Sequence, residues 1–233
     1  MKEEKKSEKV HGVFETISKE YDKANDRISL GFQRKWKGML VQKLLEETEK
    51  QGRVLDVCCG TGDISIWIAE KRKDLKIVGL DFSSSMLREA EKKSKGLSNI
   101  LWKEGDAMAL PFEEHSFSAA CISFGLRNTA DYETVLREMK RVLKEDGILY
   151  CLDSFVPDNR WIRPCYQMYF KYMMPFLGGG KKHYQEYFWL YESTQQFLRK
   201  QELLLLYQKL GLRELKVYSK MYGACVLIQG KKE

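Results

Sequence analysis

Residues 53–63 read RVLDVCCGTGD, and this stretch decides the fold. The apolar run Val54–Val57 predicts a buried strand, Gly60-Thr61-Gly62 predicts a tight turn, and Ile64–Lys71 predicts an amphipathic helix. A strand, a glycine turn and a helix in this order leave bare backbone and a helix N-terminus at one corner, where polar groups of a ligand can approach. The stretch therefore predicts a nucleoside-binding corner in an α/β sheet.

The alternation of strands and helices continues along the chain. We expect helices over 85–94, 132–144 and near 194–209, and strands over 76–80, 100–104, 118–123, 147–152, 215–220 and 224–229. Strands joined by helices through short links favour a parallel sheet, and the last two strands predict a terminal hairpin. The predicted fold class is α/β: a doubly wound, Rossmann-like, mostly parallel seven-stranded sheet with an antiparallel C-terminal strand.

Three regions lie outside this alternation. Residues 1–10 are lysine-rich and are expected to be a disordered tail, whereas residues 11–50 are expected to be largely helical. Residues 155–185 are rich in aromatic side chains and end in three glycines, which predicts a lid-like insertion over the ligand pocket. Ordinary core packing of these aromatic side chains is the alternative. We expect one domain over residues 11–233.

Three aspartates follow successive strand ends. Asp56 ends the first strand, Asp81 ends the second and lies 19 residues after Gly62, and Asp106 follows the third. A carboxylate at the second position can bind both ribose hydroxyls of a nucleoside, and one at the third can accept from an adenine amino group. Helix caps and turns without a ligand are the alternative.

The nucleoside is expected to be S-adenosylmethionine (SAM) rather than a dinucleotide. The dinucleotide fingerprint G-x-G-x-x-G would place a glycine where Ser65 stands, and Asp56 would repel a pyrophosphate. SAM has no phosphate and carries a cationic amine, which suits a carboxylate at residue 56. The cofactor-binding residues predicted so far are Asp56, Gly60, Thr61, Gly62, Asp81 and Asp106.

Composition restricts the class of protein. The chain has 233 residues, and no run approaches the roughly 18 apolar residues of a membrane span, so we expect a cytoplasmic protein. The aromatic stretch 155–180, combined with the excess of lysine and arginine, suggests transient contact with an anionic membrane surface. No continuous basic stripe with interleaved aromatics is present, so no nucleic-acid partner is expected. A homodimer stays open.

The cysteines predict no metal site, because the six show neither CxxC pairs nor interleaved histidines. Cys58-Cys59 could form a redox-active pair, or could be small residues that pack under the turn. His183, next to the glycine run, could reach the pocket.

The sequence resembles class I SAM-dependent methyltransferases and, within them, the ubiquinone/menaquinone C-methyltransferase (UbiE/MenG) family. The resemblance extends over most of residues 13–231. It rests on Tyr21-Asp22-x-x-Asn25-Asp26, Arg34-x-Trp36-Lys37, DVCCGTGDI, Phe124-Gly125-Leu126-Arg127-Asn128, Arg141-Val142-Leu143-Lys144 and Tyr187-x-x-Leu190-x-x-Ser193-x-x-x-Phe197.

The resemblance implies an enzyme that uses SAM to methylate a ring carbon of a reduced polyprenyl quinone, such as demethylmenaquinol or a ubiquinol precursor. It implies SAM contacts from Thr61, Asp81, Asp106, Ala107 and Ser123, and implies that Arg127 and Asn128 face the quinol. Another small aromatic or lipid-like acceptor, or a transfer other than methyl, is the alternative. The chain departs from the family pattern at six positions expected on or near the acceptor side. They are Ala24, where the pattern has methionine, Gln33 (histidine), Glu145 (proline), Asp153 (glutamate), Phe155 (serine) and Ile228 (histidine).

Arg127 and Asn128 are the predicted catalytic residues. A phenol titrates near pH 10, so a permanently charged guanidinium that stabilises the oxyanion would make the ring more nucleophilic. Asn128 could orient the hydroxyl or a water. A structural salt bridge between Arg127 and a nearby acid is the alternative.

Overall fold

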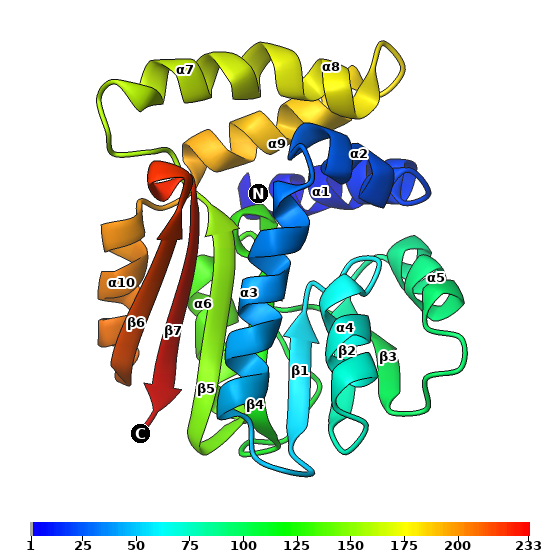
Figure 1. The fold of residues 1–233 in the computed structure, drawn as a ribbon, viewed down its shortest axis with the longest axis vertical. Coiled ribbons are helices and arrows are strands. Elements are labelled where there is room, and N and C mark those ends of the chain that lie inside the picture. The colour runs from blue at the N-terminus through cyan, green and yellow to red at the C-terminus, as the bar shows by residue number, and fades with distance from the viewer. Residues whose placement is uncertain (1) are drawn as a thin grey trace.

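A seven-stranded sheet in the order β3-β2-β1-β4-β5-β7-β6 forms the centre of the protein (Figure 1). The computed structural model describes residues 2–233, with side chains from Val10 onward. Among these strands β7 alone runs antiparallel to both of its neighbours, β5 and β6, so the predicted fold class and terminal hairpin are confirmed. The strands are β1 (Arg53–Val57), β2 (Lys76–Asp81), β3 (Ile100–Glu104), β4 (Phe117–Ser123), β5 (Leu143–Ser154), β6 (Leu212–Lys220) and β7 (Cys225–Lys232).

Helices cover both faces of the sheet and its upper edge (Figure 1). The α-helices are α1 (Lys2–Ile17), α2 (Tyr21–Ile28), α3 (Phe32–Glu47), α4 (Asp63–Lys71), α5 (Ser84–Lys93), α6 (Tyr132–Val142), α7 (Ile162–Met168), α8 (Met174–Gly179), α9 (Tyr184–Gln196) and α10 (Lys200–Lys209). Short 3-10 turns are η1 (Leu126–Asn128) and η3 (Met221–Gly223), and the π-helical turn η2 (Tyr169–Met173) joins α7 to α8.

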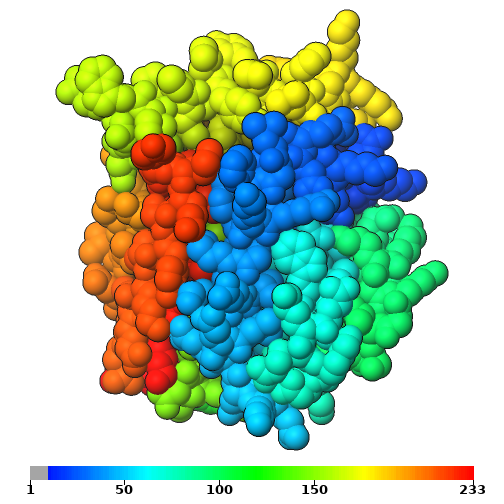
Figure 2. Space-filling view, viewed as in Figure 1, coloured from blue at the N-terminus to red at the C-terminus, as the bar shows by residue number. Residues whose placement is uncertain are grey.

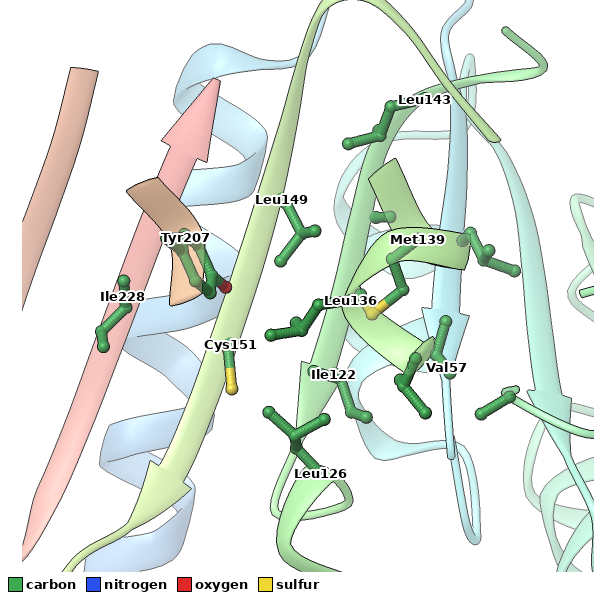
Figure 3. Packing of buried hydrophobic residues seen from close by; sticks show 14 of the residues in the cluster. Val57, Ile122, Leu126, Leu136, Met139, Leu143, Leu149, Cys151, Tyr207 and Ile228 are labelled. Carbon is green, nitrogen blue, oxygen red and sulfur yellow. The ribbon is translucent and has the colours of Figure 1, made fainter. Parts of the chain in front are cut away.

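Apolar periodicity in each helix determines the face that it buries. In α6, Val135, Leu136, Met139 and Val142 point to one side and pack with Tyr207 of α10 over β4 and β5 (Figure 3). On the other face, Leu40 and Leu44 of α3 and Ile64 and Ile68 of α4 pack over β1 and β4. The sheet is therefore buried on both sides, as its continuous apolar strands require.

A third apolar cluster lies above the carboxyl ends of the parallel strands. Val10, Phe14 and Ile17 of α1 pack there against Met86 of α5 and Trp189 of α9. The expectation of a disordered tail over residues 1–10 is therefore wrong for residues 2–10, which form the start of α1; Met1 lies outside the described residues. Apolar residues at 10, 13, 14 and 17 form a helical stripe, and its burial stabilises a helix that its charged beginning alone would not.

The helix expected near 194–209 is two helices. Phe197 lies between α9 and α10 with extended backbone, and its ring packs edge-on against Tyr132 at 5.2 Å. The Glu202 carboxylate then accepts a hydrogen bond from the Arg199 backbone N–H at 2.6 Å where α10 begins. Burial of the Phe197 ring thus outweighs helical continuity. Similarly, the helix expected to end at 144 ends at Val142, because β5 begins at Leu143.

Candidate active site

A cavity of ≈ 190 Å³ lies at the carboxyl ends of the central strands, beside the glycine turn. We call it the donor cavity. Of the predicted cofactor-binding residues, five line it: Gly60, Asp81, Asp106, Ala107 and Ser123. Asn128 lines it too. The site is thus assembled from the ends of several parallel strands, where an open α/β sheet binds its ligand.

Asp81 is buried and anchors the glycine turn. Its Oδ2 accepts a hydrogen bond from the Gly60 N–H at 2.8 Å, and its Oδ1 accepts from the Ser83 N–H at 2.9 Å. Burial raises the pKa of Asp81 to about 6, against the lowering effect of these two N–H donors. A pair of ribose hydroxyls would supply the further donors that a buried carboxylate needs.

Two buried polar atoms at the donor cavity lack a hydrogen-bond partner among the described residues. They are Oγ of Ser123 and Oδ1 of Asn128. Asp106 faces the same cavity, with Oδ1 accepting from the Met108 N–H at 2.8 Å. Buried polar atoms without partners are costly, and a polar ligand would satisfy them. The polar groups of the donor cavity are carboxylates, backbone atoms and neutral side-chain atoms. Together they fit an adenosine that carries an amino acid, and therefore fit SAM.

The other three predicted cofactor residues lie outside this cavity. Asp56 is buried in the sheet, where its Oδ2 accepts from the Oγ of Ser65 at 2.7 Å and its Oδ1 accepts from the thiol of Cys121. Burial raises the pKa of Asp56 to about 6. The structure thus gives Asp56 a role in joining β1, β4 and the start of α4, and does not bring it to the donor cavity.

Gly62 is required by packing. Its φ is +82°, and a Cβ there would overlap the indole of Trp102. Thr61 joins the turn to the N-terminal helices instead: its hydroxyl donates to the Asp22 carboxylate at 2.6 Å. Asp22 lies in the first turn of α2, and its carboxylate bonds Thr61 and Lys93.

An ionic network extends this contact around the turn. The Lys93 ammonium lies 2.7 Å from Asp22 and 2.5 Å from Asp63, and the Lys37 ammonium lies 2.9 Å from Asp63. Burial raises the pKa of Asp63, but the two lysines outweigh burial and lower it to about 2. Helices α2, α3, α4 and α5 are therefore connected by charge at the entrance to the site.

A second, larger cavity of ≈ 480 Å³ lies between the N-terminal helices and residues 155–185. We call it the acceptor cavity. Its walls are mostly apolar, and they include Trp36, Tyr166, Tyr169, Phe170 and Met174. Tyr21 and Phe124 line both cavities, so the two chambers meet at these rings. Residues 155–185 thus contribute aromatic side chains to the walls of this cavity.

Arg127 faces the acceptor cavity and is buried. Its Nη1 forms an ion pair with Asp153, which is fully buried, and its backbone N–H donates to the same carboxylate at 3.3 Å. The salt-bridge alternative is therefore present in the structure. Nε of Arg127 nevertheless lacks an acceptor among the described residues. Burial lowers the pKa of Arg127, but the carboxylate of Asp153 raises the same pKa by more. The guanidinium therefore stays charged.

The six departures from the family pattern divide unequally. Gln33 lines the acceptor cavity and Asp153 contacts Arg127. The other four do not line the cavity, but Ala24 and Phe155 are next in the chain to Asn25 and Ser154, which do. Ala24 and Ile228 are core residues, Phe155 packs on Phe197, and Glu145 is exposed beside His115. The expectation that all six lie on or near the acceptor side is therefore wrong for Glu145 and Ile228.

Cysteine and histidine side chains supply no site in the described part of the chain. Burial raises the pKa of Cys58 and of Cys59 well above the usual value, so both stay protonated and the redox alternative loses its thiolate. His183 caps α9 and does not line the acceptor cavity. Within the described residues, no group of His, Cys, Asp or Glu could hold a metal, and no helix is long and apolar enough to cross a bilayer.

The sequence prediction missed two sets of cavity residues. Val10 and Phe14 of α1 line the donor cavity, and their spacing with Val13 and Ile17 was the available signal. Tyr166 lines the acceptor cavity with a buried hydroxyl that has no partner in the described part of the chain. No sequence signal distinguishes Tyr166 from the other aromatic residues of the insertion.

The sheet order and the donor cavity define a SAM-dependent methyltransferase. Solved structures with this fold include a possible histamine N-methyltransferase from Thermotoga maritima (TM-score 0.66, 21% identity, covering 96% of this chain and 100% of that one). A SAM-dependent methyltransferase from Aquifex aeolicus aligns with a TM-score of 0.60 at 17% identity, covering 83% of this chain and 89% of that one.

Sequence comparison identifies the family. Residues 2–232 match the ubiE/COQ5 methyltransferase family, and the chain belongs to it. It is 45% identical over 221 residues to the demethylmenaquinone methyltransferase of Bacillus velezensis, covering 93% of this chain and 94% of that protein. It is 41% identical over 234 residues to the enzyme of that name from Bacillus pumilus, covering 99% of each.

Proposed function

We propose that this methyltransferase methylates a ring carbon of a reduced polyprenyl quinone of the demethylmenaquinol type. The observation that carries the proposal is the meeting of two unlike cavities at Tyr21 and Phe124. The donor cavity presents the carboxylates of Asp81 and Asp106, whereas the acceptor cavity has mostly apolar walls. The acceptor cavity suits an aromatic ring with an apolar tail. The names of the relatives support the same acceptor class.

The donor cavity would hold SAM through Gly60, Asp81, Asp106, Ala107 and Ser123. Bound SAM supplies an electrophilic methyl group, which the ring carbon gains as it loses its proton, and S-adenosylhomocysteine is released. The protein contributes by holding the acceptor ring against the donor cavity. Positioning of this kind lowers the activation free energy by on the order of 7–11 kcal/mol.

Arg127 is proposed to stabilise the phenolate that activates the ring. Asp153 accepts from Nη1, and the Nε–H of Arg127, which is buried without an acceptor among the described residues, is a donor available to an acceptor oxygen. Asn128 lines the donor cavity next to Arg127, and its Nδ2 donates to the Phe124 carbonyl at 3.3 Å, leaving Oδ1 to orient a hydroxyl or a water.

Another small aromatic or lipid-like acceptor is the second candidate, and Gln33 is the observation that favours it. The family pattern has histidine at this position, and Gln33 lines the acceptor cavity. Ala24, Glu145, Phe155 and Ile228 do not line the acceptor cavity, which weakens the rest of that case.

The partner of this enzyme is proposed to be a lipophilic quinol reached from a membrane surface, in the cytoplasm. A homodimer is compatible with the proposal but nothing in it depends on one.

The test is incubation with SAM and a reduced demethylmenaquinone, followed by mass spectrometry. Gain of one methyl group and release of S-adenosylhomocysteine are expected with the quinol, and no product with the oxidised quinone, which has no phenolic hydroxyl. A parallel incubation with other reduced aromatic lipids separates the second candidate. Tight SAM binding without product from the quinol would reject the proposal.

A further inference from the structure

Exposed apolar side chains gather on one side of the molecule. Twelve large apolar residues are exposed in the described part of the chain, and nine of them belong to only three segments. Five lie on the outer side of residues 159–179, in and beside α7, η2 and α8: Trp161, Met168, Tyr172, Met173 and Phe176. Trp161 is 76% exposed and Phe176 is 62% exposed. Such a concentration on a protein surface indicates a contact with another apolar phase or molecule.

The other four form the rim of the acceptor cavity: Leu30, Phe32, Met221 and Tyr222. Leu30 precedes α3, and Met221 and Tyr222 form the turn between β6 and β7, which lies close to the start of α7 in Figure 1. Tyr222 is 76% exposed and Leu30 is 73% exposed, although both line the cavity. The cavity therefore opens between apolar side chains that protrude into the surroundings.

Backbone strain accompanies this exposure. Leu30, Met221 and Tyr222 have φ values of +50°, +49° and +54°, a region that non-glycine residues enter at a cost. An exposed turn would ordinarily avoid the cost with glycine or asparagine. Large apolar residues in strained turns around a cavity mouth indicate that their side chains have a function there.

The charge of the same surface favours an anionic partner. Residues 159–183 contain five cationic side chains and no acidic residue: Arg160, Arg163, Lys171, Lys181 and Lys182. All five are exposed, and none has a carboxylate within salt-bridge distance in the described part of the chain. Figure 2 shows the segment that contains these residues, coloured yellow-green to yellow, along the upper edge of the molecule.

We propose that this surface docks on an anionic phospholipid bilayer, so that the acceptor cavity opens directly into the lipid. We define the docking face as the five outer apolar residues, the four rim residues and the five cations named above. Aromatic and aliphatic side chains enter the interface while lysines and arginines contact the lipid phosphates. An acceptor with an isoprenoid tail then reaches the cavity without crossing water. The inference rests on the proposed function only for the identity of that acceptor.

Vesicle flotation with the full-length protein tests the docking face. Wild type is expected to float with vesicles of phosphatidylcholine and phosphatidylglycerol, and to float much less with phosphatidylcholine alone or at high salt. The triple variant Trp161→Ser/Tyr172→Ser/Phe176→Ser is expected to lower the vesicle partition coefficient about tenfold or more. Lys171→Glu/Lys181→Glu/Lys182→Glu is expected to lower it by roughly fivefold for each cation removed.

Matched controls come from the rest of the surface. Leu101→Ser/Leu205→Ser/Val217→Ser removes the other three exposed apolar residues, and Lys50→Glu/Lys73→Glu/Lys95→Glu reverses three exposed lysines that precede β1, β2 and β3. Both are expected to float like wild type. SAM titration of every variant verifies the fold.

Equal flotation with neutral and anionic vesicles would overturn the proposal, as would equal losses in the docking-face and control variants. A docking-face variant that floats normally but changes the solution mass would assign the face to a second copy of the chain instead. Failure of docking is separable from failure of the proposed function, because a short-tailed, water-soluble quinol needs no bilayer. Docking-face variants are expected to methylate it at the wild-type rate.

Discussion

The hydroxyl of Thr61 lies 2.6 Å from the carboxylate of Asp22, although 39 residues separate them in the chain. This hydrogen bond joins the glycine turn of the donor cavity to helix α2, and Lys93 bonds to both side chains. Helix α2 also contributes Tyr21, which lines both cavities. Order in the cofactor turn is therefore coupled to the position of a wall of the acceptor cavity.

Loss of this coupling should weaken SAM binding. Asp22→Ala removes the acceptor for Thr61 and one partner of Lys93, and we expect the Kd for SAM to rise about tenfold, the value of a single hydrogen bond to a charged group. Isothermal titration calorimetry measures it. Asp26→Ala, in the same helix, breaks only the exposed pair with Arg34 and should change Kd less than about twofold. Equal effects of the two variants would contradict the coupling.

Substitutions at Arg127 should affect catalysis, whereas substitutions at Asp153 should affect the stability of the fold. Arg127→Lys keeps a charge beside Asp153 but lacks the Nε–H, so we expect kcat to fall about 10²-fold while the Kd for SAM stays within about threefold. Asp153→Asn leaves a buried guanidinium without its counter-charge and should destabilise the fold by about 3–5 kcal/mol in urea denaturation. Asp153→Glu, which restores the family residue, keeps the pair and should remain folded. Loss of SAM binding in Arg127→Lys would reject the proposed role.

SAM affinity should depend on pH through Asp81. Burial raises the pKa of Asp81 to about 6, and two ribose hydroxyls bind the ionised form best. We therefore expect full SAM affinity above pH 6. Below about pH 6, the affinity should decrease by up to about tenfold for each further pH unit. Asp81→Asn should bind more weakly at every pH, without this slope. Asp56→Asn is the control, since Asp56 has a raised pKa of about 6 but lies outside the donor cavity. A slope that follows Asp56 instead would reassign the titrating group.

Gly62 should tolerate no side chain while Trp102 is present. Gly62→Ala would force a Cβ into the indole at a φ of +82°, and we expect a loss of about 2–3 kcal/mol in the free energy of unfolding. In a Trp102→Leu background the overlap is relieved and the cost should fall to about 1 kcal/mol, the penalty for the backbone alone. Urea denaturation of the four proteins gives the coupling energy. Additive effects would show that packing against Trp102 is not the reason for the glycine.

Removal of the Tyr166 hydroxyl should raise the stability of the protein and weaken its binding of the quinol. Its buried hydroxyl lacks a partner among the described residues, so Tyr166→Phe should raise the free energy of unfolding by about 1 kcal/mol. The hydroxyl faces the acceptor cavity, and its loss should raise the KM for the quinol several-fold without changing the Kd for SAM. Tyr207→Phe is a matched control, because that buried hydroxyl also lacks a partner among the described residues but lies in the core. A rise in stability with unchanged KM would make Tyr166 structural.

The strand–turn–helix at residues 53–71 determined much of this protein from the sequence alone. Local patterns of apolar residues and glycine specify a strand or a helix without reference to distant residues, and parallel strands have one common edge for their carboxyl ends. Strand order along the chain is therefore enough to assign Asp81 and Asp106 to one cavity, whereas Ser123 is predicted from the family resemblance. Two expectations failed where packing outweighed local sequence. Phe197 breaks a helix to bury its ring, and the charged start of α1 is helical because residues 10–17 pack onto the domain.

Only the tertiary structure decided the partners of each polar side chain. Asp56 and Asp81 look alike in sequence, each at the end of a strand, but one faces Ser65 and Cys121 inside the sheet and the other faces the donor cavity. Arg127 pairs with Asp153 from a neighbouring strand, and Thr61 pairs with a helix 39 residues away. Sequence periodicity specifies which side of an element is buried, but hydrogen bonds depend on the few ångströms between elements, which packing of the whole chain alone fixes.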